Sequence, residues 1–131
     1  MHIGGAMFFT DYSMSPTELA RALEDRGFDS LWCPNTPTFR RRASRPSLDV
    51  MDPFVVLGAA AAVTKTLLLG TGICLIAQRD PIQTAKQVAS IDQVSGGRFL
   101  FGIGNGWNED EMANHGTAFA STSWRAGVSR P

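Results

Sequence analysis

The alternation of apolar, strand-like runs with capped helices is the feature that most constrains how this chain can fold. Four such runs begin near residues 2, 30, 67 and 98, and helix signals lie between each run and the next. A strand–helix repeat of about 30 residues is typical of a parallel sheet covered by helices, and an eight-stranded barrel of such units needs about 250 residues. The 131 residues of this chain therefore predict an α/β fold with four parallel strands, half of such a barrel.

The helix boundaries are marked by residues that cap the first turn. Ser15 precedes Pro16, and Glu18 stands where a capping box requires an acid. In such a box the serine side chain accepts a backbone N–H of the first turn, and the glutamate accepts the N–H of the serine. The two later helices are predicted to begin at acid–proline pairs, Asp52-Pro53 and Asp80-Pro81.

Charge and cysteine usage narrow the class of protein. The 12 basic and 12 acidic residues balance, so no net field favours nucleic acid or a membrane surface. Cys33 and Cys74 lie in or beside apolar strands without CxxC spacing, which predicts buried free thiols. His2 and His115 are far apart, so no metal site is expected. The start of the chain lacks the marks of a signal peptide, and no apolar run approaches the ~20 residues of a membrane helix, so we expect a cytoplasmic protein.

One candidate site is the stretch "GRFLFGIGNGWNEDE" at residues 97–111. Gly102, Gly104 and Gly106 have GxGxG spacing and follow the fourth strand, whereas a dinucleotide fingerprint has GxGxxG spacing and follows the first. The interpretation that we favour is a tight turn where a strand leaves the sheet. Trp107 is either a core aromatic or a flat apolar wall of a pocket, and the acids after it suit the first turn of a helix.

A second candidate is "LGTGICLI" at residues 69–76, at the carboxyl end of the third strand. Its two glycines either let a flat ligand approach the backbone or mark a strand end with a bulge. Gln78 and Arg79 follow and are expected on the same face as such a ligand. Because ligands of parallel α/β folds bind at the carboxyl ends of strands, both candidates converge on one location.

Four motifs occur in a fixed order along the chain: "DSLW" at 29–32, "DPF" at 52–54, "LLLGTGICLIAQRDP" at 67–81 and "SGGRFLFGIGNGWNEDEM" at 95–112. In this combination the chain resembles the luciferase-like monooxygenase family, and within it the branch of oxidoreductases that use the deazaflavin F420. The similarity extends over residues 1–120, which we interpret as the N-terminal half of a luciferase-like barrel domain. Residues 121–131 are predicted to be an irregular tail.

The resemblance implies a TIM-barrel fold, here about its first four β/α units, with a cofactor at the carboxyl ends of the strands. The implied cofactor is F420 or, as the alternative, FMN, which would serve hydride transfer or oxygen activation on a small organic substrate. The strand end at Gly72-Ile73 is expected to carry a bulge with a non-prolyl cis peptide. No catalytic residue is assigned. The positions that match cofactor-binding residues of the family are Thr71, Gly72, Ile73, Gly104, Asn105 and Trp107.

The chain departs from the family pattern in two ways. Asn35 and Thr36 stand where many members carry an acid–histidine pair, so that loop lacks the family's titratable group for general acid–base chemistry. The loops after the seventh and eighth strands, which usually hold the cofactor phosphate in such barrels, are not encoded in these 131 residues, and this truncation would impair activity. The alternative is a non-catalytic half-barrel that acts as a binding or oligomerisation module. In either case we expect a homo-oligomer through the exposed barrel edges.

Overall fold

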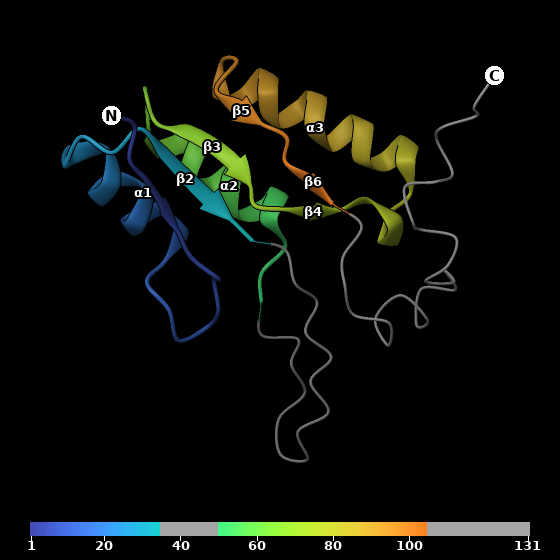
Figure 1. Cartoon of the computed structure of the whole chain (residues 1–131), viewed down its shortest axis with the longest axis horizontal. Helices are drawn as coiled ribbons and strands as arrows, with labels where there is room; N and C mark the ends of the chain where they lie inside the picture. Colours follow the sequence, from blue (N-terminus) through green and yellow to red (C-terminus); the bar gives the residue numbers. More distant parts are fainter. Residues whose placement is uncertain (35–49, 105–131) are drawn as a thin grey trace, which may run out of the picture.

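Four parallel strands form the principal sheet in the computed structural model, which describes residues 1–34 and 50–104 (Figure 1). In spatial order the strands are β1 (Gly4–Ala6), β2 (Ser30–Cys33), β3 (Leu68–Thr71) and β5 (Phe99–Leu100). A helix connects each of these strands to the next, as the sequence repeat predicts. The prediction of a parallel α/β fold is therefore confirmed, and the strand order is that of a partial barrel.

Three helices connect these strands, and each begins at the cap expected from the sequence. α1 (Pro16–Asp25) starts after Ser15, and the predicted capping box with Glu18 is formed. α2 (Pro53–Val63) and α3 (Pro81–Ser95) start after aspartates whose carboxylates accept backbone N–H groups of the first turn. Gly96 ends α3 in the left-handed conformation, with φ of 70°. Local signals therefore set the helix boundaries.

The three helices pack on one face of the sheet and bury the hydrophobic core (Figure 1). Strand residues at alternate positions, such as Leu31, Cys33 and Leu69, point into this core and are fully buried. Burial of each leucine side chain contributes roughly 1.5–3 kcal/mol. On the opposite face, Ala6 and Leu68 are exposed, and Leu68 keeps 37% of its surface accessible. The sheet therefore has one face covered by helices and one open face.

The third and fourth predicted strands are each interrupted before their expected ends. After β3 the chain continues as β4 (Cys74–Leu75) and a short 3-10 helix, η1 (Ile76–Gln78). After β5 it continues as β6 (Ile103–Gly104), which pairs in parallel with β4 to form a separate two-stranded sheet. The interruption at Gly72-Ile73 agrees with the bulge that the resemblance implied. The interruption of the fourth strand was not predicted, because hydrophobicity does not show where a ladder of backbone hydrogen bonds stops.

Arg98, just before β5, connects this strand to the end of α2, to the residues that follow α2 and to the end of α3 through hydrogen bonds. Its guanidinium donates hydrogen bonds to the carbonyl oxygens of Ala61 and Thr64 at 3.2 and 3.1 Å, and to Thr64 Oγ1 at 2.9 Å. It also reaches the carbonyl oxygens of Leu67 at 2.8 Å and Ser95 at 2.6 Å. Because Ala61 and Thr64 lie at the carboxyl end of α2, the positive charge also complements the dipole of that helix.

Glu24 near the end of α1 holds the turn that leads into β3. One of its carboxylate oxygens accepts the backbone N–H groups of Lys65, Thr66 and Leu67 at 2.8, 2.7 and 3.0 Å. The Thr66 hydroxyl donates to the same oxygen at 3.0 Å. Partial burial pushes the pKa of Glu24 up, but the four hydrogen bonds together outweigh it and lower the pKa to about 2. Glu24 and Arg98 therefore stabilise the end of the sheet opposite the candidate site.

The predicted boundary between residues 1–120 and 121–131 lies outside the described residues, so this division stays a prediction. Most of the predicted loop at residues 34–51 lies outside them as well. No helix in the described part of the chain is long and apolar enough to cross a membrane.

Candidate functional site

The candidate site lies where β3 and β5 end, at the carboxyl edge of the parallel sheet. Here β3 gives way to β4 across Gly72 and Ile73, and the peptide bond between these two residues is cis, as the resemblance implied. On the neighbouring segment, Phe101 and Gly102 separate β5 from β6. The two interruptions lie side by side, because β3 pairs with β5 before them and β4 pairs with β6 after them. We call residues 71–73 the bulge.

Thr71 and Gly102 connect the two strand interruptions through two reciprocal hydrogen bonds. The Thr71 hydroxyl donates to the Gly102 carbonyl oxygen at 2.8 Å and accepts the Gly102 N–H at 3.0 Å. The same carbonyl oxygen accepts the Cys74 N–H at 2.7 Å. Thr71 is fully buried, so its hydroxyl is committed to the protein and fixes the bulge in place. This contact was not predicted; its one sequence signal is a glycine inside an apolar strand, which indicates close approach of another backbone.

Two glycines of this site lie close against the neighbouring segment, and at Gly102 the backbone leaves no room for a side chain. A Cβ atom at Gly102 would overlap the carbonyl oxygen of Thr71, which belongs to the backbone and cannot turn aside. A Cβ atom at Gly104 would overlap Cδ1 of Ile73. At Gly72 an added Cβ would meet nothing closer than 3.5 Å. The glycines at 102 and 104 therefore serve the close packing of β6 and its lead-in against the bulge.

The surface of the bulge is open, apolar and uncharged. Ile73 keeps 38% of its surface exposed, and Gly72 is exposed as well. No charged side chain occurs in residues 70–76 or 99–104. A surface of accessible backbone and aliphatic carbon suits a flat, largely apolar ring rather than a phosphate group or a metal ion. The described residues at this edge therefore fit the ring of a flavin or deazaflavin.

Beside the bulge, Arg79 ties the segment before α3 to the start of α2. Its guanidinium forms an ion pair with Asp52 and lies 5.0 Å from the centre of the Phe54 ring. Asp52 also accepts the Phe54 N–H at 2.8 Å, so one carboxylate both caps α2 and holds Arg79. The sequence analysis expected Arg79 and Gln78 on the same face as a ligand, and this stays a prediction. In the structure the Arg79 guanidinium points to the start of α2, where the capping carboxylate of Asp52 provides an opposite charge. Arg79 therefore links the segment before α3 to the start of α2.

Two cysteines lie next to the site, and both are buried and free, as predicted. Burial, together with the nearby Asp52 carboxylate, raises the pKa of Cys33 to about 12. Burial also raises the pKa of Cys74, against the opposing effect of the Arg79 charge. Neither thiol is therefore a thiolate nucleophile at neutral pH. Within residues 1–34 and 50–104, no group of three His, Cys, Asp or Glu side chains is placed to hold a metal ion.

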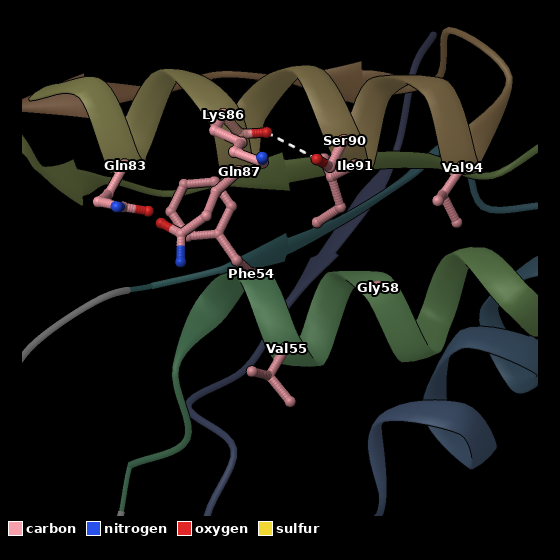
Figure 2. A pocket seen from close by; sticks show the side chains of 9 residues that line it. All are labelled: Phe54, Val55, Gly58, Gln83, Lys86, Gln87, Ser90, Ile91 and Val94. Atoms are coloured by element: carbon pink, nitrogen blue, oxygen red, sulfur yellow. Dashed lines mark hydrogen bonds between the residues drawn. The ribbon is translucent and has the colours of Figure 1, made fainter.

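A separate open groove of about 410 Å³ lies between α2 and α3 (Figure 2). Figure 2 shows Phe54 and Gln83 near the amino-terminal ends of the two helices and Val94 further along α3. None of the predicted cofactor-binding residues lines this groove. Because ligands of parallel α/β folds bind at the carboxyl ends of strands, we locate the candidate site at the bulge instead. The lining residues are Phe54, Val55, Gly58, Gln83, Lys86, Gln87, Ser90, Ile91 and Val94.

Two of the predicted cofactor-binding residues, Asn105 and Trp107, lie outside the described residues. Asn35 and Thr36, the positions at which the chain departs from the acid–histidine pair, lie outside them as well. The other four predicted residues are brought together at the bulge and at the adjoining end of β6. The described part of the site is therefore one wall of a pocket, made of accessible backbone and aliphatic carbon. The remaining predicted cofactor-binding residues lie beyond residue 104.

A family of known proteins matches most of the chain. The family model described as luciferase-like monooxygenase matches residues 15–126. An uncharacterized protein of Mycobacterium tuberculosis is 36% identical over 129 residues, which covers 88% of this chain and 46% of that protein. This chain therefore spans about half the length of the curated relatives that it matches first.

Solved structures place the fold among TIM-barrel enzymes. The oxygenating constituent of 3,6-diketocamphane monooxygenase from Pseudomonas putida, in complex with FMN, superposes with a TM-score of 0.74 at 21% identity, covering 94% of this chain and 34% of that one. The coenzyme F420 dependent tetrahydromethanopterin reductase from Methanopyrus kandleri superposes with a TM-score of 0.67 at 28% identity, covering 90% of this chain and 30% of that one. Both likenesses support the partial-barrel architecture seen in the sheet.

Proposed function

Because the chain belongs to the luciferase-like monooxygenase family, we propose that it forms one half of the cofactor pocket of an oxidoreductase. The observation that carries this proposal is the uncharged, apolar surface of the bulge, which the Thr71–Gly102 hydrogen bonds hold in place. The bound cofactor, F420 or FMN, would supply hydride transfer or oxygen activation on a small organic substrate. The described residues would bind and orient its ring and exclude water from one side of it.

The four described candidate residues have different roles in this proposal. Gly72 and Ile73 present the accessible backbone and aliphatic carbon against which a flat ring can lie. Thr71 is a positioning residue, because its buried hydroxyl both donates to and accepts from Gly102. Gly104 leaves room for Cδ1 of Ile73, where a larger residue would meet it. None of these four residues has a side chain that titrates near neutral pH, so the acid–base chemistry of the reaction belongs to groups elsewhere.

Between the two cofactors we favour F420. The Methanopyrus kandleri reductase, described as coenzyme F420 dependent, is 28% identical, whereas the FMN-bound Pseudomonas putida enzyme is 21% identical. As the resemblance implies, Asn105 and Trp107 would continue the pocket wall beyond β6. A cytoplasmic location is proposed with this assignment.

The second candidate function is a non-catalytic half-barrel that binds a partner or a second copy of itself. The observation that favours it is the open face of the sheet, on which Leu68 keeps 37% of its surface exposed. Within the described residues, β1 and β5 also have one unpaired edge each. Exposed edges favour pairing with another chain, so we propose association through them. A monodisperse monomer in size-exclusion chromatography with light scattering would count against such an oligomer.

Equilibrium titration with F420 and with FMN, followed by the fluorescence of each cofactor, separates the two candidates. The oxidoreductase proposal expects saturable binding in the micromolar range to this chain. Ile73→Ala is expected to weaken binding about fivefold, because the aliphatic carbon that it removes is worth about 1 kcal/mol when it is covered by a ring.

Val55→Ala is the matched control for this titration. Val55 is an aliphatic residue with 70% of its surface exposed, but it lies in the groove between α2 and α3. Its truncation should leave the affinity for either cofactor unchanged. Equal losses in the two variants would show that the cofactor does not bind at the bulge, and the absence of saturable binding of both cofactors would favour the non-catalytic module.

A further inference from the structure

Trp32 on β2 lies flat across the open face of the sheet. One glycine on each neighbouring strand lies directly beside the indole. A Cβ atom at Gly4 on β1 would lie 3.1 Å from Nε1 and 3.2 Å from Cδ1, on the pyrrole side of the indole. A Cβ atom at Gly70 on β3 would overlap Cε3 and Cζ3, on the benzene side. The indole therefore reaches from β1 to β3, and glycines at these two positions make room for it.

The orientation of this indole is fixed by a hydrogen bond. Nε1 of Trp32 donates to the Ser30 hydroxyl oxygen at 2.9 Å, and Ser30 lies two residues away on the same face of β2. This bond satisfies the single polar atom of the indole. The ring surface that faces away from the sheet is left as an apolar plane, and Trp32 is only partly buried. A large aromatic residue held in one orientation offers a preorganised surface for another flat ring.

The indole also adjoins the bulge. A Cβ atom at Gly72 would lie 3.5 Å from Cβ and 3.7 Å from Cε3 of Trp32, which is ordinary van der Waals contact. Gly72 thus shares the open face of the sheet with Trp32, whereas Thr71 points to the opposite side and is fully buried. The wall at Gly72 and Ile73 and the plane of the indole therefore meet at one corner of the open face.

We propose that Trp32 forms the floor of the cofactor pocket and determines how deeply the flat ring of F420 or FMN enters between the strand ends. This inference rests on the proposed function, and it adds a ring-positioning residue on β2 to the wall at the bulge. The floor takes planar aromatic ligands, because its polar atom is already bonded to Ser30 and its accessible surface is apolar. Stacking of a planar ring on an aromatic side chain in a solvated groove changes affinity by roughly tenfold or more.

The test compares Trp32→Phe, Trp32→Ala and Leu68→Ala by cofactor titration and thermal unfolding. Leu68 lies on the same face of the sheet, opposite Ser30 in the register, and serves as the control for general loss of packing. Trp32→Ala is expected to weaken binding of the preferred cofactor about tenfold, Trp32→Phe by about twofold to threefold, and Leu68→Ala by less than about twofold. Trp32→Phe keeps an aromatic plane and so guards against a variant that fails to fold.

The fluorescence of the bound cofactor shows whether Trp32 touches the cofactor ring or only stabilises the fold. Tryptophan in van der Waals contact with an excited flavin or deazaflavin ring quenches its emission by electron transfer, whereas phenylalanine does not. Fluorescence of the bound cofactor is therefore expected to rise in Trp32→Phe and to stay at the wild-type level in Leu68→Ala. Unchanged affinity and unchanged emission in both Trp32 variants would overturn this inference alone. Failure of the wild-type chain to bind either cofactor would overturn the proposed function and this inference with it.

Discussion

Replacement of Gly102 by alanine tests whether the site depends on the close approach of two interrupted strands. The added Cβ would overlap the carbonyl oxygen of Thr71, a backbone atom that cannot rotate away. Either the segment that carries residue 102 or the bulge must therefore shift. That shift would stretch the hydrogen bonds between Gly102 and Thr71, at 2.8 and 3.0 Å, and the bond from Cys74 N–H to the Gly102 carbonyl oxygen, at 2.7 Å.

The expected cost follows from these contacts. Forcing a methyl group into a closely packed site costs about 1–3 kcal/mol. Each of the three hydrogen bonds contributes about 1 kcal/mol, and a backbone shift that satisfies the overlap weakens some of them. We therefore expect Gly102→Ala to lower the free energy of unfolding by about 3–4 kcal/mol, a large fraction of the 5–15 kcal/mol that is typical of a domain.

Urea unfolding followed by circular dichroism measures this change, and Gly58→Ala is its matched control. Gly58 lies inside α2, and an added Cβ there would meet nothing within 4 Å. Alanine at this helical position is expected to raise the free energy of unfolding by about 0.5–1 kcal/mol. The two glycine-to-alanine changes should therefore have opposite signs. A Gly102→Ala variant as stable as the wild type would refute the inferred packing of the bulge against residue 102.

Three further outcomes follow from the described contacts. Arg98→Met should lower the free energy of unfolding by about 2–3 kcal/mol in urea titrations, because it removes five hydrogen bonds. Arg26 is exposed and makes one such bond, so Arg26→Met should change the free energy of unfolding by less than about 0.5 kcal/mol. Glu24→Gln should cost about 1 kcal/mol at neutral pH once solvent screening is allowed for. Because the folded pKa of Glu24 is lowered from 4.5 to about 2, this difference from the wild type should be present above pH 4.5 and vanish as pH falls to about 2 in unfolding curves. Burial raises the pKa of Cys33 to about 12, so its thiol should resist iodoacetamide at pH 8 in the native protein and react in urea. Mass spectrometry of the intact chain measures this reaction. Rapid alkylation of Cys33 in the native protein would contradict its burial.

The helix boundaries could be predicted from sequence because their causes are local. Ser15 and Glu18 form their capping box within four residues, and Asp52 and Asp80 each cap the turn that follows. The parallel order of the strands also followed from the repeat, since a strand–helix–strand connection returns the chain in the same direction. These features need no knowledge of which distant residues meet.

The details of the site depend on contacts between residues far apart in sequence. Thr71 and Gly102 are 31 residues apart, and the hydrophobic pattern does not show that hydrogen bonds join them. The ion pair of Arg79 with Asp52 joins residues 27 apart. Only the register of the strands reveals that Trp32 lies beside Gly70. The resemblance located the bulge, but the residues that hold it in place required the structure.

The account's central claim is that the ring of the cofactor lies against the bulge, and amide chemical-shift mapping tests it most directly. Spectra of the ¹⁵N-labelled chain would be recorded while F420 or FMN is added to saturation. We predict that the largest shifts occur at the amides of Gly72, Ile73 and Gly104, with little change at Gly58 and Ser90 in the groove between α2 and α3. Shifts centred on the groove, with the bulge unchanged, would contradict the claim.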